Sequence, residues 1–247
     1  MSAVSTVSAV TPSDVPVFVL CGGLGTRLKE ETEFRPKPMV PIGGEPILAH
    51  IVRIYRRHGF ERFVLCLGFK AEAIEESFAN EAGVTLVRTG ESAMTGARVA
   101  RAAQQCLGDA EHFAVTYGDG LTDADLAAEL DFHVERGGIG TVLGVNPPSR
   151  FGELKIEGDS VVEFDEKPQI RDHWVNGGFF FFRRAFLDYL SPDDDCVLER
   201  EPLVRLARDG GLAVYRHAGY WASMDTQRDM EQLNELYARG EAPWTSS

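Results

Sequence analysis

A glycine-rich turn followed by basic side chains is the first feature of the sequence that could do chemistry. The apolar run over residues 15–21 ends in Gly-Gly-Leu-Gly at residues 22–25, and Arg27 and Lys37 follow within a dozen positions. Glycine has no Cβ, so the backbone can turn tightly and point its N–H groups at an anion while basic side chains neutralise the charge. The stretch therefore predicts a strand that leads into a phosphate-binding loop.

Two common nucleotide-binding loops do not fit this stretch. A Walker loop needs Lys followed by Ser or Thr directly after its last glycine, whereas Thr26 and Arg27 follow Gly25. A dinucleotide-binding fingerprint needs a third glycine where Leu28 stands. The sequence therefore argues against a P-loop NTPase and against a nicotinamide-dependent dehydrogenase.

The whole pattern resembles the sugar-1-phosphate nucleotidyltransferases, whose G-G-x-G-T-R-L loop is followed by a Lys-Pro pair. Residues 22–28 and Lys37-Pro38 carry that resemblance here. The stretch R-T-G-E-S-A-M-T-G-A-R at residues 88–98 and G-Y-W-A-S-M-D-T at residues 219–226 are similar to elements of the glucose-1-phosphate cytidylyltransferases. The resemblance covers nearly the whole chain, so this family sets the expectations for the site.

The resemblance implies a nucleotide site around the loop. The amides of residues 22–25 and the Arg27 side chain are expected on the β- and γ-phosphates, and Lys37 is expected near the α-phosphate. Arg98 is expected to hold the pyrimidine nucleotide, because a guanidinium donates hydrogen bonds without accepting any. The nucleotide-binding set is Leu20, Cys21, Gly22, Gly23, Leu24, Gly25, Thr26, Arg27, Lys37, Arg98 and Gly118.

The resemblance also implies a metal site and a sugar site. Asp119, between two glycines after an apolar strand, and Asp225 match the carboxylates that hold Mg²⁺ in the family, and hard cations prefer carboxylate oxygen. Each aspartate could instead form a turn or cap a helix. Lys167 of the Glu-Lys-Pro motif is expected on the phosphate of the sugar 1-phosphate. The sugar-binding set is Gly152, Glu166, Lys167, Asn176, Gly177, Glu201 and Trp221.

Alternating strands and helices must position these residues. Apolar runs at residues 62–67, 84–87 and 112–117 predict buried strands, and helical spacing predicts helices over residues 46–58 and 71–78. This alternation predicts an α/β fold with a Rossmann-like, mostly parallel (mixed) sheet flanked by helices, whose ligand lies beyond the carboxyl ends of the strands. The resemblance adds a nucleotidyltransferase, GT-A-like fold with a sugar-binding β-hairpin region.

The periodicity changes in the second half of the chain. Residues 151–156 and 160–164 flank a Glu-Gly-Asp turn and predict a hairpin, where a sugar-binding half should begin within the same sheet. Residues 183–190 predict a helix, and residues 226–239 predict the final helix. Glu201 could equally supply a favourable charge in the first turn of a helix.

Length and composition bound the number of domains. A chain of 247 residues with 44% hydrophobic residues is expected to form one core. Residues 1–13 are small and polar without the features of a signal peptide, which predicts a disordered leader. Residues 14–247 then form a single domain, with a nucleotide-binding half over about 14–145 and a sugar-binding half over about 146–247.

Net charge and cysteine spacing restrict the partners. A formal charge of −13 argues against nucleic acid or an anionic membrane as a partner. No apolar run approaches the roughly 20 residues that span a bilayer. The four cysteines have no C-x-x-C spacing, which favours reduced thiols in a cytoplasmic protein. A homo-oligomer is expected.

The resemblance implies a Mg²⁺-dependent transfer of CMP from CTP to a sugar 1-phosphate, foremost glucose 1-phosphate, giving CDP-glucose and pyrophosphate. One alternative is the same chemistry with UTP or dTTP, or with another phosphorylated acceptor. A second alternative is a catalytically inactive, sugar-nucleotide-binding regulatory subunit. The expected catalytic residues argue against the inactive subunit, and they are Arg27, Lys37, Asp119, Lys167 and Asp225.

Two positions depart from the family pattern. The family has an extra stretch between the second helix and the third strand, which residues 79–83 bridge directly here. Ala93 stands where the family tends to have a hydroxyl residue. The first departure bears on the oligomer interface, and the second bears on the choice of base and acceptor.

Overall fold

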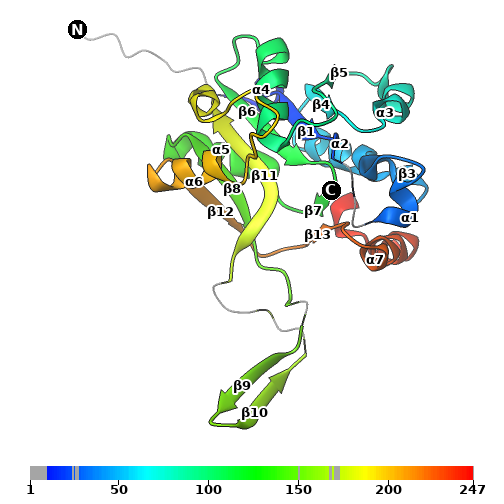
Figure 1. The fold of residues 1–247 in the computed structure, drawn as a ribbon, viewed down its shortest axis with the longest axis vertical. Helices are drawn as coiled ribbons and strands as arrows, with labels where there is room; N and C mark the ends of the chain where they lie inside the picture. The colour runs from blue at the N-terminus through cyan, green and yellow to red at the C-terminus, as the bar shows by residue number, and fades with distance from the viewer. Residues whose placement is uncertain are drawn as a thin grey trace.

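A large mixed sheet organises the chain in the computed structural model. The structure describes residues 10–23, 25, 28–149, 151–166, 169 and 173–246. Within these residues, seven strands form the sheet in the order β12-β8-β11-β6-β1-β4-β5 (Figure 1). Their bounds are β1 Val17–Leu20, β4 Phe63–Leu67, β5 Val84–Arg88, β6 His112–Tyr117, β8 Gly140–Val145, β11 Val175–Arg183 and β12 Leu212–His217.

The strand directions confirm the expected Rossmann-like, mostly parallel sheet. β1 pairs in parallel with β4 and β6, and so do β4 with β5 and β8 with β12. β11 runs antiparallel to β6 and β8 and joins the two parallel parts. In β1, Val17 and Val19 contact one hydrophobic core, whereas Phe18 and Leu20 contact the other. Strands buried on both faces are continuous apolar runs, as the sequence has them.

Helices cover both faces of this sheet. α2 and α5 pack on the face of Val17, and α4 and α6 pack on the face of Phe18. No helix in the described part of the chain is long and apolar enough to cross a membrane. The helical elements are η1 Pro12–Asp14, α1 Lys29–Thr32, η2 Lys37–Met39, α2 Ile47–Arg57, α3 Ala71–Phe78, α4 Thr95–Cys106, α5 Leu126–Arg136, η3 Arg184–Tyr189, α6 Glu201–Arg208, α7 Gln227–Ala238 and η4 Pro243–Thr245, where η marks a 3-10 helix.

One expected helix is a 3-10 helix rather than an α-helix. Residues 183–190 were expected to form a helix, and η3 Arg184–Tyr189 is a 3-10 helix of six residues. Segments this short make few α-helical hydrogen bonds, so their geometry is set by packing. Phe186 of η3 stacks on Phe182 of β11 with ring centroids 3.8 Å apart, which holds the segment against the sheet.

The predicted hairpin is present but stands outside the main sheet. β9 Glu153–Glu157 and β10 Ser160–Asp165 pair with each other, and Figure 1 shows them extending away from the body of the molecule. The sugar-binding half was expected to begin here within the same sheet; β11 and β12 of that half do pair in the main sheet, whereas the hairpin does not. The physical reason is that β11 and β12 already pair with both edges of β8, the strand that precedes it. Shorter strands elsewhere are β2 Pro41–Ile42, β3 Glu45–Pro46, β7 Gly120–Thr122 and β13 Trp221–Ser223.

The described start of the chain lies against the body. Residues 1–9 lie outside the described residues, whereas Val10 packs on the hydrophobic core and η1 follows it. Residues 10–13 of the expected leader are therefore ordered by contact with the domain.

A buried carboxyl group lies in the core beneath α5. Glu129 is 0% exposed, and neither of its carboxyl oxygens has a hydrogen-bond partner among the described residues. Burial, followed by the charge of Glu129, raises the pKa of the Tyr55 hydroxyl. Burial raises the pKa of Glu129 well above its ordinary value of 4.5.

This group predicts a pH-dependent stability. Above pH 4.5 the unfolded chain loses the proton that folded Glu129 keeps, so the free energy of unfolding falls as the pH rises toward the folded pKa. We expect Glu129→Gln to be more stable than wild type at pH 8, by about 1.4 kcal/mol for each pH unit of this loss, and to lose most of that advantage at pH 5. Urea unfolding at both pH values measures this, with the exposed Asp131→Asn as control. If the free energies of unfolding of Glu129→Gln and wild type differed equally at both pH values, the prediction would be contradicted.

Candidate active site

A cavity of about 690 Å³ opens where β1 and β6 end. Segments following β1 and β6 line it, together with η2, the loop before α4, the start of β11 and the end of β13. The nucleotide and metal residues expected from the sequence lie in its wall wherever the structure describes them: Leu20, Cys21, Gly22, Gly23, Gly25, Lys37, Arg98, Gly118, Asp119 and Asp225. Leu24, Thr26 and Arg27 lie outside the described residues.

A lysine between two carboxylates forms the charged centre of this cavity. The Lys37 ammonium donates to Asp119 Oδ2 at 2.6 Å and to Asp225 Oδ1 at 2.9 Å. All three side chains are partly buried, with exposed fractions of 13%, 26% and 18% respectively. Residues far apart in the sequence thus meet at one point on the cavity wall.

The helix that follows Asp225 is capped by other side chains. Thr226 accepts from the backbone N–H of Asp229, and the Asp229 carboxylate accepts from the N–H of Thr226, which makes a capping box for α7. The Asp225 carboxylate instead faces Lys37 and accepts a hydrogen bond from Ser223 at 3.0 Å. Its side chain is therefore directed to the cavity.

The two carboxylates stabilise the charged form of Lys37. Burial by itself lowers the pKa of Lys37, but the charges and hydrogen bonds of Asp119 and Asp225 outweigh it, so the net pKa is raised. The ammonium keeps its proton throughout the neutral range and remains a fixed positive charge beside the glycine-rich turn.

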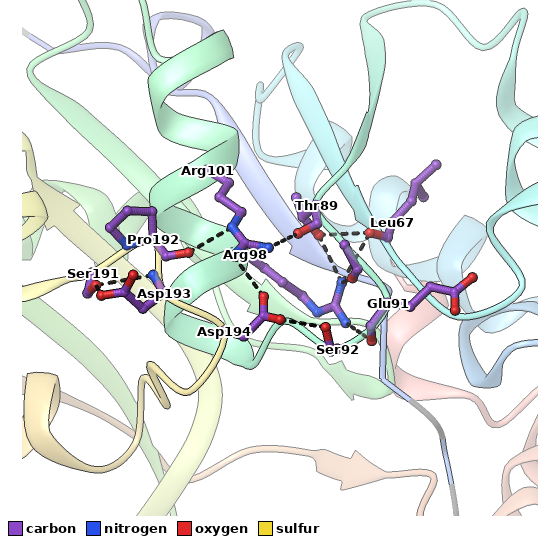
Figure 2. Close-up of polar contacts among 11 residues, drawn as sticks. Leu67, Thr89, Glu91, Ser92, Arg98, Arg101, Ser191, Pro192, Asp193 and Asp194 are labelled. Atoms are coloured by element: carbon purple, nitrogen blue, oxygen red, sulfur yellow. Dashed lines mark hydrogen bonds and ion pairs between the residues drawn. The ribbon is translucent and has the colours of Figure 1, made fainter.

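Arg98 is buried and bonded to backbone around the loop. Its guanidinium donates to the carbonyls of Gly22 at 2.9 Å, Leu67 at 3.1 Å and Gly90 at 2.7 Å. It also donates to the Thr89 hydroxyl at 2.9 Å (Figure 2). These contacts hold the start of the glycine-rich turn against the ends of β4 and β5.

The glycine at position 22 is required by this arrangement. A Cβ built on Gly22 would lie 2.1 Å from Arg98 Nη1, and one built on Gly68 would lie 2.4 Å from the same atom. Neither contact is compatible with van der Waals radii, so both positions need the absence of a side chain for the guanidinium to reach the loop.

A second arginine, which the sequence analysis did not assign to the site, fixes the same loop from outside. Arg101 donates to the Thr89 carbonyl at 2.8 Å and to Asp194 Oδ1 at 2.7 Å, and Ser92 donates to Asp194 Oδ2 at 2.5 Å (Figure 2). The Ser92 hydrogen bond, followed by the one from Arg101, lowers the pKa of Asp194. No local spacing could reveal this pairing, because Asp194 comes from a distant part of the chain.

Part of the expected sugar site also lies in the wall of this cavity. Asn176, Gly177 and Trp221 line it. Trp221 Nε1 donates to the Gly177 carbonyl at 2.7 Å, which ties β13 to the start of β11. Asn176 Nδ2 donates to the Tyr117 hydroxyl at 3.2 Å, and Asn176 Oδ1 accepts from the N–H of Gly178 at 2.8 Å.

Three of the remaining expected sugar residues lie outside this cavity. Gly152 and Glu166 sit at the base of the hairpin and do not line the cavity. Glu201 begins α6, is exposed, and pairs with Arg205 at 3.2 Å outside the cavity. Lys167 lies outside the described residues.

Comparison with known proteins decides the family. The Nucleotidyl transferase family model matches residues 17–238. The chain belongs to this family. This nucleotidyl transferase is 42% identical to a glucose-1-phosphate cytidylyltransferase of Salmonella typhi, over 92% of this chain and 97% of the relative. It is also 33% identical to a mannose-1-phosphate guanylyltransferase of Mycobacterium tuberculosis, over 93% of this chain and 66% of the relative.

Solved structures share the fold. HddC from Yersinia pseudotuberculosis, complexed with GMP-PN, is 25% identical with a TM-score of 0.70, covering 90% of this chain and 99% of that one. A putative glucose-1-phosphate thymidylyltransferase from Bacillus anthracis is 20% identical with a TM-score of 0.71, covering 90% of this chain and 94% of that one. The expected nucleotidyltransferase fold is thereby confirmed.

Asp119 and Asp225 fit a divalent cation, which nucleotidyl transferases of this family generally use. Their oxygens already converge on one positive charge, the Lys37 ammonium, and both line the cavity. Among the described residues, no group of three or more His, Cys, Asp or Glu side chains could hold a metal ion. A cation between these two carboxylates would therefore need further oxygen ligands from substrate or water.

Proposed function

We propose that this nucleotidyl transferase moves CMP from CTP to a sugar 1-phosphate, foremost α-D-glucose 1-phosphate, and releases CDP-glucose and pyrophosphate. The observation that carries the proposal is the similarity to glucose-1-phosphate cytidylyltransferases over nearly the full length of the chain. The cavity with Lys37, Asp119 and Asp225 in its wall supplies the charges that such a reaction needs.

The reaction needs positioning more than proton transfer. A phosphate oxygen of the sugar 1-phosphate attacks the α-phosphorus of CTP, the new P–O bond forms, and the bond to the β-phosphate oxygen breaks in line. A phosphate monoester has a second pKa of about 6, so at neutral pH the nucleophile is already largely dianionic. Catalysis then consists of aligning two polyanions and neutralising the charge that develops on them.

Each residue has a defined task in this scheme. The amides of Gly22, Gly23 and Gly25 and the Arg27 side chain bind the β- and γ-phosphates. Lys37 reaches the α-phosphate, where its fixed positive charge offsets developing negative charge. Lys167 seats the phosphate of the acceptor.

Mg²⁺ is the divalent cation we propose for the two aspartates. Asp119 and Asp225 would hold it, and when bound it supplies charge neutralisation for the nucleotide phosphates. A cation held by these carboxylates would replace the Lys37 ammonium between them and would leave Lys37 free to contact phosphate. A lysine suits this exchange because its compact charge sits on a flexible stem.

Two alternative functions predict different behaviour. The first uses another nucleotide, as the guanylyltransferase relative shows that the family admits other bases. The second is an inactive regulatory subunit, which would have no use for a lysine held between two carboxylates in an open cavity. The charged centre therefore favours the enzyme.

We also propose that the protein is a homo-oligomer. In the hairpin, Leu154 is paired with Phe164 and Ile156 with Val161, and these four apolar side chains are 49%, 61%, 60% and 55% exposed. A two-stranded hairpin is at best marginally stable by itself, and an exposed apolar face of this kind is typical of a protein interface. A second copy of the chain is the proposed cover.

The reaction is tested by pyrophosphate release from purified protein with glucose 1-phosphate and Mg²⁺, with CTP, UTP, dTTP, ATP and GTP offered separately. We expect release with CTP, and a loss on the order of hundreds-fold in Asp119→Asn and in Asp225→Asn while circular dichroism stays unchanged. The exposed Asp109→Asn serves as control. Release with another nucleotide would overturn the base assignment, and near-normal activity in both site variants would overturn the metal assignment.

The oligomer is tested by light scattering coupled to size exclusion. We expect wild type to elute at a multiple of the chain mass, and Ile156→Lys or Phe164→Lys to shift it toward the monomer because a buried lysine would be desolvated. Lys155→Gln, on the other face of the same strand, should leave the mass unchanged. A monomeric wild type would contradict the proposal.

A further inference from the structure

Glu199 links two walls of the cavity, although the sequence analysis did not assign it a role. Its Oε1 accepts a hydrogen bond from the Tyr117 hydroxyl at 2.6 Å, and its Oε2 accepts one from the Thr95 hydroxyl at 2.7 Å. Thr95 begins α4, and Tyr117 ends β6 two residues before Asp119. One carboxylate therefore connects the loop next to Arg98 with the strand that carries Asp119.

The chemistry of a carboxylate fixes the direction of the Tyr117 hydrogen bond. A carboxylate can accept but cannot donate, so the Tyr117 hydroxyl must give its proton to Glu199. The phenol oxygen can then only accept from other partners. Burial, followed by the charge of Glu199, raises the pKa of Tyr117, so the phenol keeps its proton at neutral pH.

The direction of the Tyr117 hydrogen bond also determines how the Asn176 amide is oriented. Because the Tyr117 oxygen can only accept, the group facing it must be a donor, and Asn176 Nδ2 lies there at 3.2 Å. The amide oxygen is then turned to the backbone N–H of Gly178 at 2.8 Å, a donor whose direction is fixed by the main chain. The amide of Asn176 is held in one of its two orientations from both sides.

The orientation decides what Asn176 offers to a ligand. With one N–H given to Tyr117 and one lone pair of the oxygen given to Gly178, the amide retains one donor and one acceptor. A sugar hydroxyl both donates and accepts, so it matches that remaining pair. A reversed amide would place the donor and the acceptor on exchanged sides.

We propose that Glu199 is a positioning residue for the acceptor sugar, acting through Tyr117 to orient the Asn176 amide toward a sugar hydroxyl. This inference rests on the proposed function, because it takes the ligand beside Asn176 to be the sugar of a sugar 1-phosphate. It assigns no contact between Glu199 and the substrate. The effect of Glu199 must therefore pass through the Tyr117 hydroxyl.

The substitution Glu199→Gln tests this chain of hydrogen bonds. A glutamine can donate as well as accept, so Tyr117 is released from its fixed direction and one of the two contacts that orient the Asn176 amide is lost. We expect affinity for CDP-glucose, measured by calorimetry, to fall about tenfold, the size of one hydrogen bond to a ligand, while affinity for CTP changes less than about twofold. Glu111→Gln, an exposed carboxyl at the other end of β6, is the matched control and should change neither affinity.

A second variant separates positioning from folding. In Tyr117→Phe the proposed route is already cut, so adding Glu199→Gln should cost no further affinity for CDP-glucose. A merely structural Glu199 would instead weaken CTP and CDP-glucose alike, and its effect would persist in the Tyr117→Phe background. Either of those results, or a Glu199→Gln that behaves like Glu111→Gln, would overturn the inference.

The same experiment separates this inference from the proposed function. A wild type that binds CTP but not CDP-glucose would overturn the proposed reaction and, with it, the identity of the sugar beside Asn176. A wild type that binds both ligands, with a Glu199→Gln that loses neither, would leave the reaction standing and overturn the role of Glu199.

Discussion

The contact of one ammonium with two carboxylates determines how the site is built. The Lys37 ammonium donates to Asp119 and to Asp225. Lys37 begins η2, Asp119 follows the end of β6, and Asp225 lies in the segment before α7. Two carboxylates that bind the same ammonium would repel each other if no cation lay between them. In this structure the Lys37 ammonium is that cation, and it holds the two carboxylates together on the wall of the cavity.

The sheet explains why these segments meet. Residues after β1 and after β6 leave the same edge because the two strands are parallel neighbours. Arg98 fixes the glycine-rich turn by donating a hydrogen bond to the Gly22 carbonyl. Met224 donates its N–H to the Asp119 carbonyl at 2.9 Å, which aligns the neighbouring Asp225 with the end of β6. The positioning is thus done by backbone contacts around a small charged centre.

Much of this site could be predicted because its signals are local. Short stretches of sequence are enough to predict the strands, because their apolar runs are unambiguous. The glycines after β1 and Asp119 after β6 directly follow such stretches. Glu199 and Asp194 could not be predicted, because their roles depend on which distant hydroxyl or arginine folding brings beside them. Glu201 shows the same limit, since an acid two residues from Glu199 points away from the cavity.

The hairpin marks a second limit of sequence reasoning. Alternating apolar residues predict two strands but do not state which surface they cover, and here β9 and β10 leave the body of the molecule (Figure 1). Gly152 and Glu166, at its base, are separated from the cavity that holds Asn176. The placement of the expected sugar residues is therefore determined by tertiary structure rather than by the motif.

The most direct test of this account is a calorimetric titration of Mn²⁺ into wild type and Lys37→Met without nucleotide. If the Lys37 ammonium occupies the position that the cation takes between Asp119 and Asp225, its removal must strengthen binding. We predict an affinity at least about tenfold higher in Lys37→Met, since a competing charge-assisted contact is lost, and no binding when Asp119→Asn is added. Equal or weaker binding by Lys37→Met would contradict it.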